Sequence, residues 1–417
     1  MWSDQAHSVT AEYDLLVVGS GPHALTCCTY LLRQRPALRE RLLVVDPEGW
    51  LTCWNRRFDM LGIDRLRSHA IDHPDPDPYA LWRFAQGPDK EMGPYTAPGV
   101  ELFARFCRTL ITRHGLEEVL RRGRVERIAS WDQGMCAVLT DGTRLSAGHV
   151  VLATNTRIPR IPGWARDLTT QAPAGRIAHT EELDLPEAHL PGEHVLVVGG
   201  GLTAGQIALT AVSRGATITL ACRRQVRRQV FDFTAGWLTP AELRGFYAEP
   251  AAHCRLTTVH AARRSSMTPD VFITLRETNR TGSIHLLEDC VVTSARWDSD
   301  RWLVNLGERT EEFQRIWLAT GTTPRVDTEL LGPLTISQPI ETAGGLPMLD
   351  EACRWPGTPV HMMGAHAALQ LGPAACNLAG ARMAAERIAA CIAPLDRYQY
   401  VQPTRPKIRS SPTADRL

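Results

Sequence analysis

The first fifty residues alternate between apolar runs and small or polar residues in a way that predicts a strand, a tight turn and a helix. The run Leu15–Val18 is unbroken by polar residues, as is typical of a parallel strand buried on both faces. The apolar positions between Ala24 and Leu32 indicate a helix that begins with a proline. The turn between them is made of Gly19, Ser20, Gly21, Pro22 and His23. Such a unit presents backbone N–H groups and the positive end of a helix to a pyrophosphate.

The next apolar run, residues 41–46, predicts a second strand that ends in a carboxylate. Asp46 lies 25 residues beyond Gly21, and an acid at about that distance can bind the ribose hydroxyls of an adenosine. The alternative is a solvated charge at the end of a strand. The strand and its terminal acid together favour a nucleotide site over a chance loop.

A second unit of the same kind follows about 180 residues later. The run 194–198 leads into three consecutive glycines and a helix, and the next strand, 216–220, ends close to two arginines. The expected nucleotide contacts of this unit are Gly199, Gly201, Leu202, Thr203, Arg223 and Arg224. Guanidinium groups at this strand end suit a 2′-phosphate, which favours NADPH over NADH. The alternative is that both arginines are ordinary surface residues of an arginine-rich chain.

Residues 47–100 show no long periodic pattern, and the proline-rich stretch 72–78 is unsuited to a helix or a central strand. We therefore expect a long irregular segment, which in a compact domain is usually functional or disordered. The side chains of Trp50 and Trp54 argue against disorder, because they can form a wall for a planar cofactor or pack in an ordinary core. His73 has no second histidine at ligand spacing, so we expect a structural role for it and no metal site.

The rest of the pattern predicts one long helix and several short strands before the chain returns to a buried strand. The helix is expected within 99–115, and the strands at 125–128, 135–139, 149–153, 271–275, 283–287, 302–306 and 315–318. Further on, Gly372-Pro373 is expected at the opening turn of a long helix that runs through Ala390.

Two similar buried strands, at 149–155 and 315–321, bracket the second unit, which implies that the first domain is discontinuous. The expected fold is α/β, with two Rossmann-like dinucleotide-binding domains of the three-layer ββα/β kind, one inserted into the other. The expected division is 1–158 with 318–393 for the first domain, 159–317 for the inserted domain, and 394–417 for a poorly ordered tail.

Composition narrows the class of protein further. With 44% hydrophobic residues, 22% charged residues and a net charge of +1, the chain has no strong field to recruit nucleic acid or an anionic membrane. No run approaches the ~20 apolar residues of a membrane span, and the N-terminus lacks a signal-peptide profile, so we expect a cytoplasmic protein. The 11 cysteines are scattered without a Cys-x-x-Cys motif, which favours free thiols over disulfides or zinc ligands.

Together, both glycine turns, Asp46, the strand ending in Leu318-Ala319-Thr320-Gly321 and the terminal glycines resemble the two-dinucleotide-binding-domain flavoproteins over roughly residues 12–392. The resemblance implies FAD and NADPH as cofactors. The first turn would hold the FAD pyrophosphate, Asp46 the FAD ribose, the second turn NADPH, and the terminal segment the flavin ring. The further cofactor contacts assigned on this basis are Thr320, Gly321, Gly364, Leu371 and Gly372, with Trp50 and Trp54 as candidate neighbours of the flavin.

Within these flavoproteins, residues 173–183 resemble the motif Phe-x-Gly-x-x-x-His-x-x-x-aromatic of the class B flavin monooxygenases. Gly175 and His179 match in spacing and in position between the two nucleotide folds, whereas Pro173 and Leu183 depart from the two ends. The N-hydroxylating members, similar to ornithine and lysine N-hydroxylases, tolerate such ends and share the tryptophan-rich segment after the first acid. The resemblance assigns His179 to the linker that shapes the NADP site.

One departure from the N-hydroxylases bears on the substrate. Ornithine hydroxylases use a lysine shortly after the tryptophan-rich segment to bind the amino-acid carboxylate, and this chain has no lysine there. Arg67 can replace that lysine as a bidentate partner of a carboxylate, or the segment reads a different substrate. The identity of the substrate therefore does not carry over.

The resemblance implies a monooxygenase that inserts one oxygen atom of O2 on a nucleophilic N or S of a small molecule through a C4a-(hydro)peroxyflavin. The flavin carries the chemistry, and the protein positions the reactants and excludes water. Two alternatives stay open: a reductase that passes electrons from NADPH to a quinone or protein acceptor, and a sensor or scaffold whose flavin site has decayed. The expected partners are a small-molecule substrate and O2, with neither nucleic acid nor membrane, and a homo-oligomer is left open.

Overall fold

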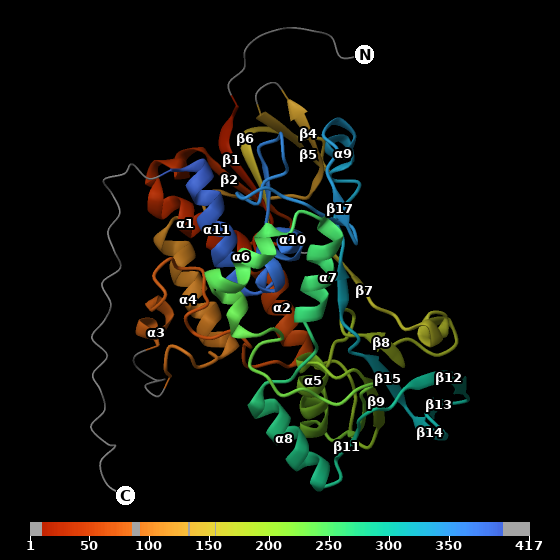
Figure 1. Cartoon of the computed structure of the whole chain (residues 1–417). Helices are drawn as coiled ribbons and strands as arrows, with labels where there is room; N and C mark the ends of the chain where they lie inside the picture. The colour runs from red at the N-terminus through yellow and green to blue at the C-terminus, as the bar shows by residue number, and fades with distance from the viewer. Residues whose placement is uncertain (1–10, 86–91, 132–133, 155, 395–417) are drawn as a thin grey trace, which may run out of the picture.

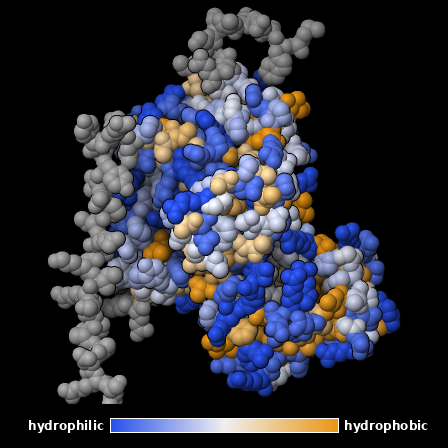
Figure 2. Space-filling view, in the orientation of Figure 1, coloured by the Kyte–Doolittle hydropathy of each residue, from blue (hydrophilic) through white to orange (hydrophobic). Residues whose placement is uncertain are grey.

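The structure is a computed structural model, and it describes residues 11–85, 92–131, 134–154 and 156–394. The tail expected over 394–417 lies outside the described residues except for Pro394. Two sheets organise the described chain, and the helices pack around them (Figure 1). The surface in Figure 2 is largely hydrophilic, with apolar residues in separate groups. Among the described helices, none combines the length and apolar character needed to cross a membrane.

The first sheet carries the first glycine turn and has the strand order β3-β2-β1-β6-β5-β4, with β19 paired to β6. Its strands are β1 Tyr13–Val18, β2 Leu42–Asp46, β3 Leu120–Arg122, β4 Val125–Trp131, β5 Gly134–Leu139, β6 Arg144–Leu152 and β19 Val360–Met362. Strands β3, β2, β1, β6 and β19 run parallel, and β4 and β5 continue the sheet as an antiparallel hairpin pair. Helices α1 Pro22–Gln34, α4 Val100–Arg113 and α11 Leu378–Ile392 share one apolar core with this sheet.

The second sheet is fully parallel, with the order β11-β10-β9-β15-β8. Its strands are β8 Ile177–His179, β9 His194–Val198, β10 Thr217–Ala221, β11 Ile284–Leu287 and β15 Arg315–Leu318. Helices α5 Leu202–Ser213 and α8 Pro269–Arg280 share one core with it, and a three-stranded antiparallel sheet shares another. That sheet consists of β12 Val292–Asp298, β13 Arg301–Leu306 and β14 Arg309–Phe313. This arrangement confirms the predicted α/β class with a three-layer ββα domain.

Two short antiparallel strands, β7 Arg157–Pro159 and β16 Thr322–Pro324, carry the chain from the first sheet to the second and back. The backbone N–H of Arg160 donates to the carbonyl of Gly321 at 2.9 Å beside this pair. Since the chain crosses here in both directions, the first domain is built from two separate parts of the sequence. The exact domain limits given above stay a prediction.

The segment between β10 and α8 lies against the first sheet's domain, although the sequence led us to expect it to complete the second. It contains η4 Ala235–Leu238, α6 Pro240–Ala248 and α7 Ala252–Ala262. Phe246 and Val259 belong to the core of the first sheet, and Arg255 of α7 donates to the carbonyl of Leu369 at 3.0 Å. Figure 1 shows α6 and α7 beside α10 Ala368–Leu371 and α11.

Three local expectations are wrong. Residues expected to be irregular form α2 Thr52–Leu61, an amphipathic helix bounded by two positive φ angles, 60° at Leu51 and 61° at Gly62. The strand expected at 271–275 is part of α8, which starts with a proline at its first position. Pro373 does not open the last long helix, because it opens the short turn η6 Gly372–Ala374, and α11 begins at Leu378.

The remaining elements are short. They are α3 Ala80–Phe84, α9 Gly332–Ser337, β17 Thr342–Ala343, β18 Leu346–Pro347, η1 Pro36–Arg41, η2 Gly163–Ala165, η3 Leu168–Thr170 and η5 Gly364–Ala367. The proline-rich stretch 72–78 is held in place by α11, because Arg382 donates to the carbonyls of His73 and Asp75 at 3.0 and 2.6 Å. His73 is fully buried and accepts from the backbone N–H of Asp75 at 3.1 Å, in agreement with a structural role.

Candidate functional site

The two glycine turns are built in the same way. Gly19 follows β1 with φ +103°, and Gly199 follows β9 with φ +150°, both outside the range that other residues adopt easily. A Cβ on Gly19 would lie 2.9 Å from the carbonyl oxygen of Ala153, and one on Gly199 would lie 2.3 Å from that of Ala319. Each turn therefore packs directly on the backbone at the end of a neighbouring parallel strand, and only glycine allows that approach.

The next glycine of each turn stands at the start of a helix and faces open space. Gly21 precedes α1 and Gly201 precedes α5, and neither helix has a side-chain cap. A Cβ on Gly21 would meet nothing within 4 Å, and one on Gly201 would meet only Ser265, at 3.9 Å. The first N–H groups of α1 and α5, including those of His23 and Thr203, are therefore directed to a space where a phosphate can approach.

Asp46 ties the first turn to the loop after β2. Its Oδ2 accepts from the backbone N–H of Ser20 at 3.1 Å, and its Oδ1 accepts from those of Glu48 and Gly49 at 2.8 and 3.0 Å. The Ser20 hydroxyl donates to the carbonyl of Gly49 at 2.7 Å. A carboxylate oxygen offers two lone pairs, so Oδ2 keeps one for a ribose hydroxyl beside the pyrophosphate turn.

His23 brings the first turn into contact with the C-terminal segment. A Cβ on Gly364 would lie 3.7 Å from Nδ1 of His23, and the His23 ring also contacts the backbone of Cys376. Nδ1 is buried without a hydrogen-bond partner, and burial lowers the pKa of His23 to about 4. A neutral imidazole with one unsatisfied nitrogen, placed between Gly21 and Gly364, suits a bound cofactor that supplies the missing partner.

The C-terminal segment wraps around this junction through two left-handed glycines. Gly364 has φ +70° and Gly372 has φ +73°, and Leu371 between them is fully buried. Arg255 donates to Oε1 of the neighbouring Gln370 at 3.1 Å. Helix α7 therefore fixes the part of the chain that the resemblance assigns to the flavin ring.

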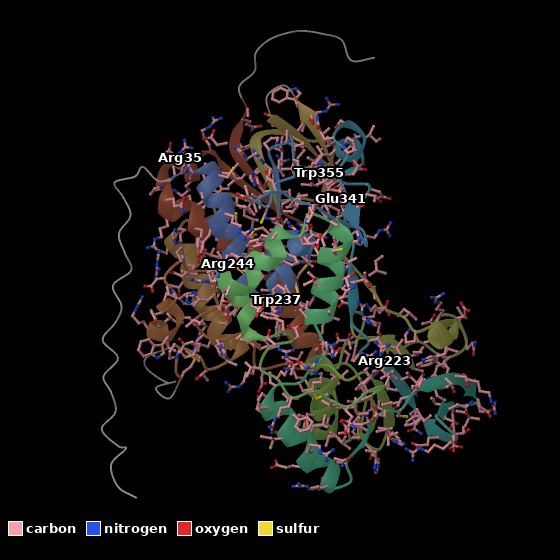
Figure 3. The ribbon with its side chains drawn as sticks, in the orientation of Figure 1. Arg35, Arg223, Trp237, Arg244, Glu341 and Trp355 are labelled. Carbon is pink, nitrogen blue, oxygen red and sulfur yellow. The ribbon has the colours of Figure 1, made fainter. Side chains whose placement is uncertain are left out.

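The second turn ends in a basic surface. Arg223 and Arg224 follow β10 and are both exposed, as are Arg227 and Arg228 in the next turn of the chain. Figure 3 places Arg223 on the lobe of the second sheet, away from Trp237 near α10. Exposed guanidinium groups at this strand end suit a 2′-phosphate, whereas Asp46 occupies the corresponding place after the first turn.

His179 is a positioning residue at the crossing between the sheets. Its Nε2 lies 3.1 Å from the carbonyl oxygen of Gly321, and its Nδ1 accepts from the backbone N–H of Glu181 at 3.1 Å, so Nε2 carries the proton. Burial lowers the pKa of His179, which keeps the ring neutral. Thr320, next to Gly321, donates its hydroxyl to the carbonyl of Arg160. Both residues therefore hold the crossing strands together.

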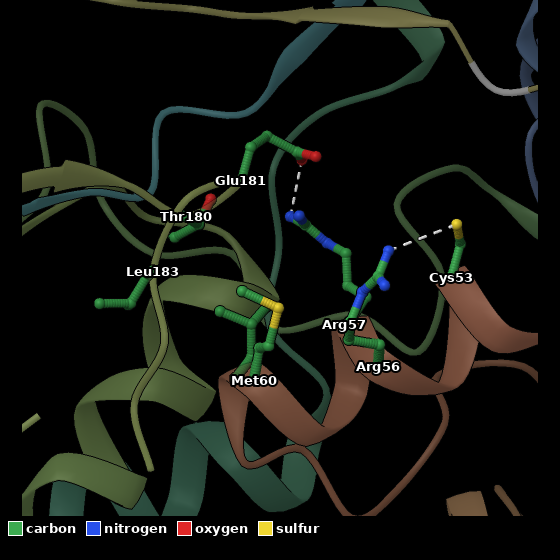
Figure 4. Close-up of a pocket in the computed structure, with 8 residues that line it drawn as sticks. Cys53, Arg56, Arg57, Met60, Thr180, Glu181 and Leu183 are labelled. Atoms are coloured by element: carbon green, nitrogen blue, oxygen red, sulfur yellow. Dashed lines mark hydrogen bonds and ion pairs between the residues drawn. The ribbon is translucent and has the colours of Figure 1, made fainter. Parts of the chain in front are cut away.

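A pocket of about 130 Å³ opens next to His179, between α2 and residues 180–183. Glu181 forms an ion pair there with Arg57 of α2 at 2.6 Å (Figure 4). It forms a second ion pair with Arg157 of β7 at 3.5 Å. Because these residues come from both sheets' domains, the network ties α2 to the inserted domain.

Three predicted site residues have other contacts. The ring N–H of Trp50 donates to the carbonyl of Leu116 at 3.1 Å, and its side chain is buried. Trp54 packs on Phe58, with 4.5 Å between ring centroids. Arg67 donates to the carbonyl of Val230 at 2.7 Å and to further groups of residues 229 and 266. Both tryptophan side chains pack against neighbouring parts of the protein. The hydrogen bonds of Arg67 leave it no pair of free N–H groups to bind both oxygens of a carboxylate.

Three residues near the C-terminal segment were missed in the sequence. Nδ1 of His366 and Oδ1 of Asp232 are buried without partners, and Arg263 pairs with Asp232. The sequence carried only one usable signal, an acid between two phenylalanines at 231–233. Among the described residues no group of three or more potential ligands forms a metal site, and the described cysteines are free thiols.

Comparison with known proteins agrees with this geometry. Residues 16–157 match a family described as FAD-NAD(P)-binding. No curated protein matches the sequence.

Solved structures match most of the chain at low sequence identity. Ornithine hydroxylase (PvdA) from Pseudomonas aeruginosa has a TM-score of 0.71 at 18% identity, covering 91% of this chain and 98% of its own. The cadaverine monooxygenase DfoA from Erwinia amylovora has a TM-score of 0.72 at 18% identity, covering 96% and 100%. Bacillithiol disulfide reductase (YpdA) from Bacillus cereus has a TM-score of 0.58 at 15% identity, covering 91% and 98%. The chain therefore has the fold of two-domain flavin monooxygenases, which confirms the resemblance drawn from the sequence.

Proposed function

We propose that this chain is an FAD- and NADPH-dependent monooxygenase that places one oxygen atom of O2 on a nucleophilic nitrogen or sulfur of a small molecule. The proposal rests on one observation: the two glycine turns have equivalent structures, but an acidic residue follows the first and basic residues follow the second. Asp46 follows the turn that contacts the C-terminal segment, and Arg223 and Arg224 follow the other. Two turns of one design, one with an acid and one with bases, suit two different dinucleotides.

In this proposal FAD occupies the first turn and NADPH the second. When bound, these cofactors supply hydride transfer and the activation of O2. The chain's own contribution is positional: the N–H groups after Gly21 and Gly201 bind the pyrophosphates, and Asp46 binds the FAD ribose. His23 hydrogen-bonds the FAD, and His179 holds the crossing strands between the two cofactors. A small-molecule substrate and O2 are the expected partners.

The proposal is tested by following the fate of O2 in the FAD-loaded protein. NADPH is added without O2, and O2 is then admitted with and without small amines or thioethers. We expect NADPH to reduce the flavin, and the yield of hydrogen peroxide per O2 to fall when a substrate is present. A peroxide yield equal to the O2 consumed with every compound would contradict oxygen insertion.

Replacing Arg223 and Arg224 with alanine should weaken NADPH binding and leave NADH binding unchanged. Each guanidinium removed costs a charge-assisted bond to the 2′-phosphate, so KM for NADPH should rise roughly 10- to 100-fold. The measurement is the rate of flavin reduction against the concentration of each nucleotide, with exposed Arg309→Ala on β14 as control. Equal changes for NADPH and NADH would show that the arginines do not read the 2′-phosphate.

The second candidate is a reductase without oxygenation, and the similarity in fold to a bacillithiol disulfide reductase favours it. The absence of a Cys-x-x-Cys motif counts against a disulfide substrate. A reductase would oxidise NADPH only when a quinone or protein acceptor is added. The O2 experiment described above separates the two candidates.

A further inference from the structure

The segment between β10 and α6 covers the part of the chain to which we assign the flavin ring. Phe231 and Phe233 are stacked with ring centroids 5.5 Å apart and form an apolar cluster with Ala374 of η6. Trp237 and Met383 pack against the same cluster. A small molecule bound over the flavin ring would therefore meet this segment.

Asp232 stands between the two phenylalanines and has one unsatisfied oxygen. Its Oδ2 pairs with Arg263, and its Oδ1 is buried without a hydrogen-bond partner. Arg263 also donates to the carbonyl of Pro373 at 2.7 Å and to Oδ1 of Asn377 at 3.2 Å. The carboxylate is therefore anchored to the C-terminal segment on one side and lacks a donor on the other. An unpaired carboxylate oxygen is costly to bury, so a ligand that donates to it gains affinity.

The two arginines that interact with the Asp232 carboxylate, Arg67 and Arg263, already have other hydrogen-bond partners. The guanidinium of Arg67 donates to Val230 at 2.7 Å and to the Ser266 hydroxyl at 2.6 Å, and Arg263 has the contacts given above. The chain's two lysines, at positions 90 and 407, lie outside the described residues. Neither cation beside Asp232 is therefore free to receive a substrate carboxylate.

We propose that Oδ1 of Asp232 binds a substrate ammonium group, and that the substrate is a small diamine without a carboxylate. One nitrogen is held as an ammonium ion by Asp232, and the other is oxidised as a neutral amine. This inference rests on the proposed monooxygenase function. An α-carboxylate next to the bound ammonium would be repelled by Asp232, and the hydrogen bonds of Arg67 and Arg263 leave neither guanidinium free to bind that carboxylate.

The reaction balances with the cofactors already proposed. An N–O bond forms at the neutral amine and the O–O bond breaks, so the amine becomes a hydroxylamine. The second oxygen atom leaves as water, with two electrons from NADPH and one proton from solvent. The ammonium group on Asp232 takes no part in the bond changes, and Asp232 is therefore a binding residue.

Two pairs of compounds that differ only by a carboxylate test the inference: putrescine with ornithine, and cadaverine with lysine. Binding is measured by the change in the visible flavin spectrum of the oxidised, FAD-loaded enzyme, which requires no turnover. We expect each diamine to bind at least about 10-fold more tightly than its amino acid. Asp232→Asn should weaken diamine binding by roughly 10- to 100-fold and reduce the preference, because a neutral amide keeps the shape and loses the charge.

Asp232→Glu should retain the preference for diamines, and Asp300→Asn on the exposed β12–β13 turn should behave as the unaltered enzyme. Flavin content and thermal unfolding show whether each variant is folded. The inference is overturned if the unaltered enzyme binds the amino acids as tightly as the diamines, if no diamine changes the flavin spectrum, or if folded Asp232→Asn keeps the preference. Hydroxylation of amino acids alone would overturn the inference and support the proposed function. Diamine binding that depends on Asp232, without any O2-dependent product, would support the ammonium site and contradict the proposed monooxygenase function.

Discussion

An enzyme with Gly199→Ala is expected to keep its flavin and to lose reduction by NADPH. The new Cβ would lie 2.3 Å from the carbonyl oxygen of Ala319, and alanine is strained at φ +150°. The turn must move away from β15, at a cost of roughly 2–4 kcal/mol. If bound NADPH forces the turn back into its native conformation, this cost is subtracted from the free energy of binding. The affinity for NADPH then falls roughly 30- to 1000-fold. The measurement is the rate of anaerobic flavin reduction as NADPH is varied.

Gly163→Ala is the matched control for this variant, since a Cβ there meets nothing within 4 Å and the residue lies in the same inserted part of the chain. We expect it to bind NADPH normally. If Gly199→Ala is reduced by NADPH as fast as the unaltered enzyme, the second turn is not the NADPH site. If Gly199→Ala is purified without flavin, the second turn also affects FAD binding, and the two turns do not act independently.

Gly19→Ala should produce the opposite result: a protein that is purified without FAD and unfolds more easily. Its Cβ would lie 2.9 Å from the carbonyl oxygen of Ala153 in a backbone with φ +103°. We expect a loss of roughly 1–3 kcal/mol of folding free energy even without cofactor. The measurements are the flavin-to-protein ratio after purification and urea unfolding of the apoprotein.

Gly21→Ala separates folding from binding at the same turn. Its Cβ would meet no protein atom within 4 Å and its φ is −75°, so the apoprotein should be as stable as the unaltered one. FAD should nevertheless bind more weakly, because the added methyl group occupies the space at the start of α1. Full flavin content in both Gly19→Ala and Gly21→Ala would place the FAD pyrophosphate elsewhere.

The sequence predicted those parts of the fold that are determined by residues close together in the chain. A continuous apolar run followed by glycine specifies a buried parallel strand and a tight turn, and both units were recognised in this way with Asp46 and Arg223 at their ends. The two crossings between the sheets were also predicted, because strands β6 and β15 carry similar runs. These features depend on burial and backbone conformation, which the residue pattern records directly.

The parts that were missed depend on contacts between distant segments. Helix α2 was missed because its N-cap, Leu51, has a left-handed backbone conformation and no capping side chain, although Gly62 is a conventional glycine C-cap. The hydrogen bonds of Arg67 could not be predicted, because its partners at 229–230 and 266 lie more than 160 residues away. Asp232 was missed for a similar reason, because its partner Arg263 lies 31 residues away and is itself held by Pro373, 110 residues further on.

The most direct test of the central claim is an oxygen-18 experiment with the FAD-loaded enzyme, NADPH and cadaverine. Labelled O2 is admitted after anaerobic reduction, and the amine product is analysed by mass spectrometry together with the hydrogen peroxide formed. We expect a hydroxylamine that carries one labelled oxygen atom, and its formation should depend on NADPH and on the second glycine turn. The same experiment is run with putrescine, ornithine and lysine. Recovery of all consumed O2 as hydrogen peroxide, with no labelled product from any of the four compounds, would contradict the proposed monooxygenase function.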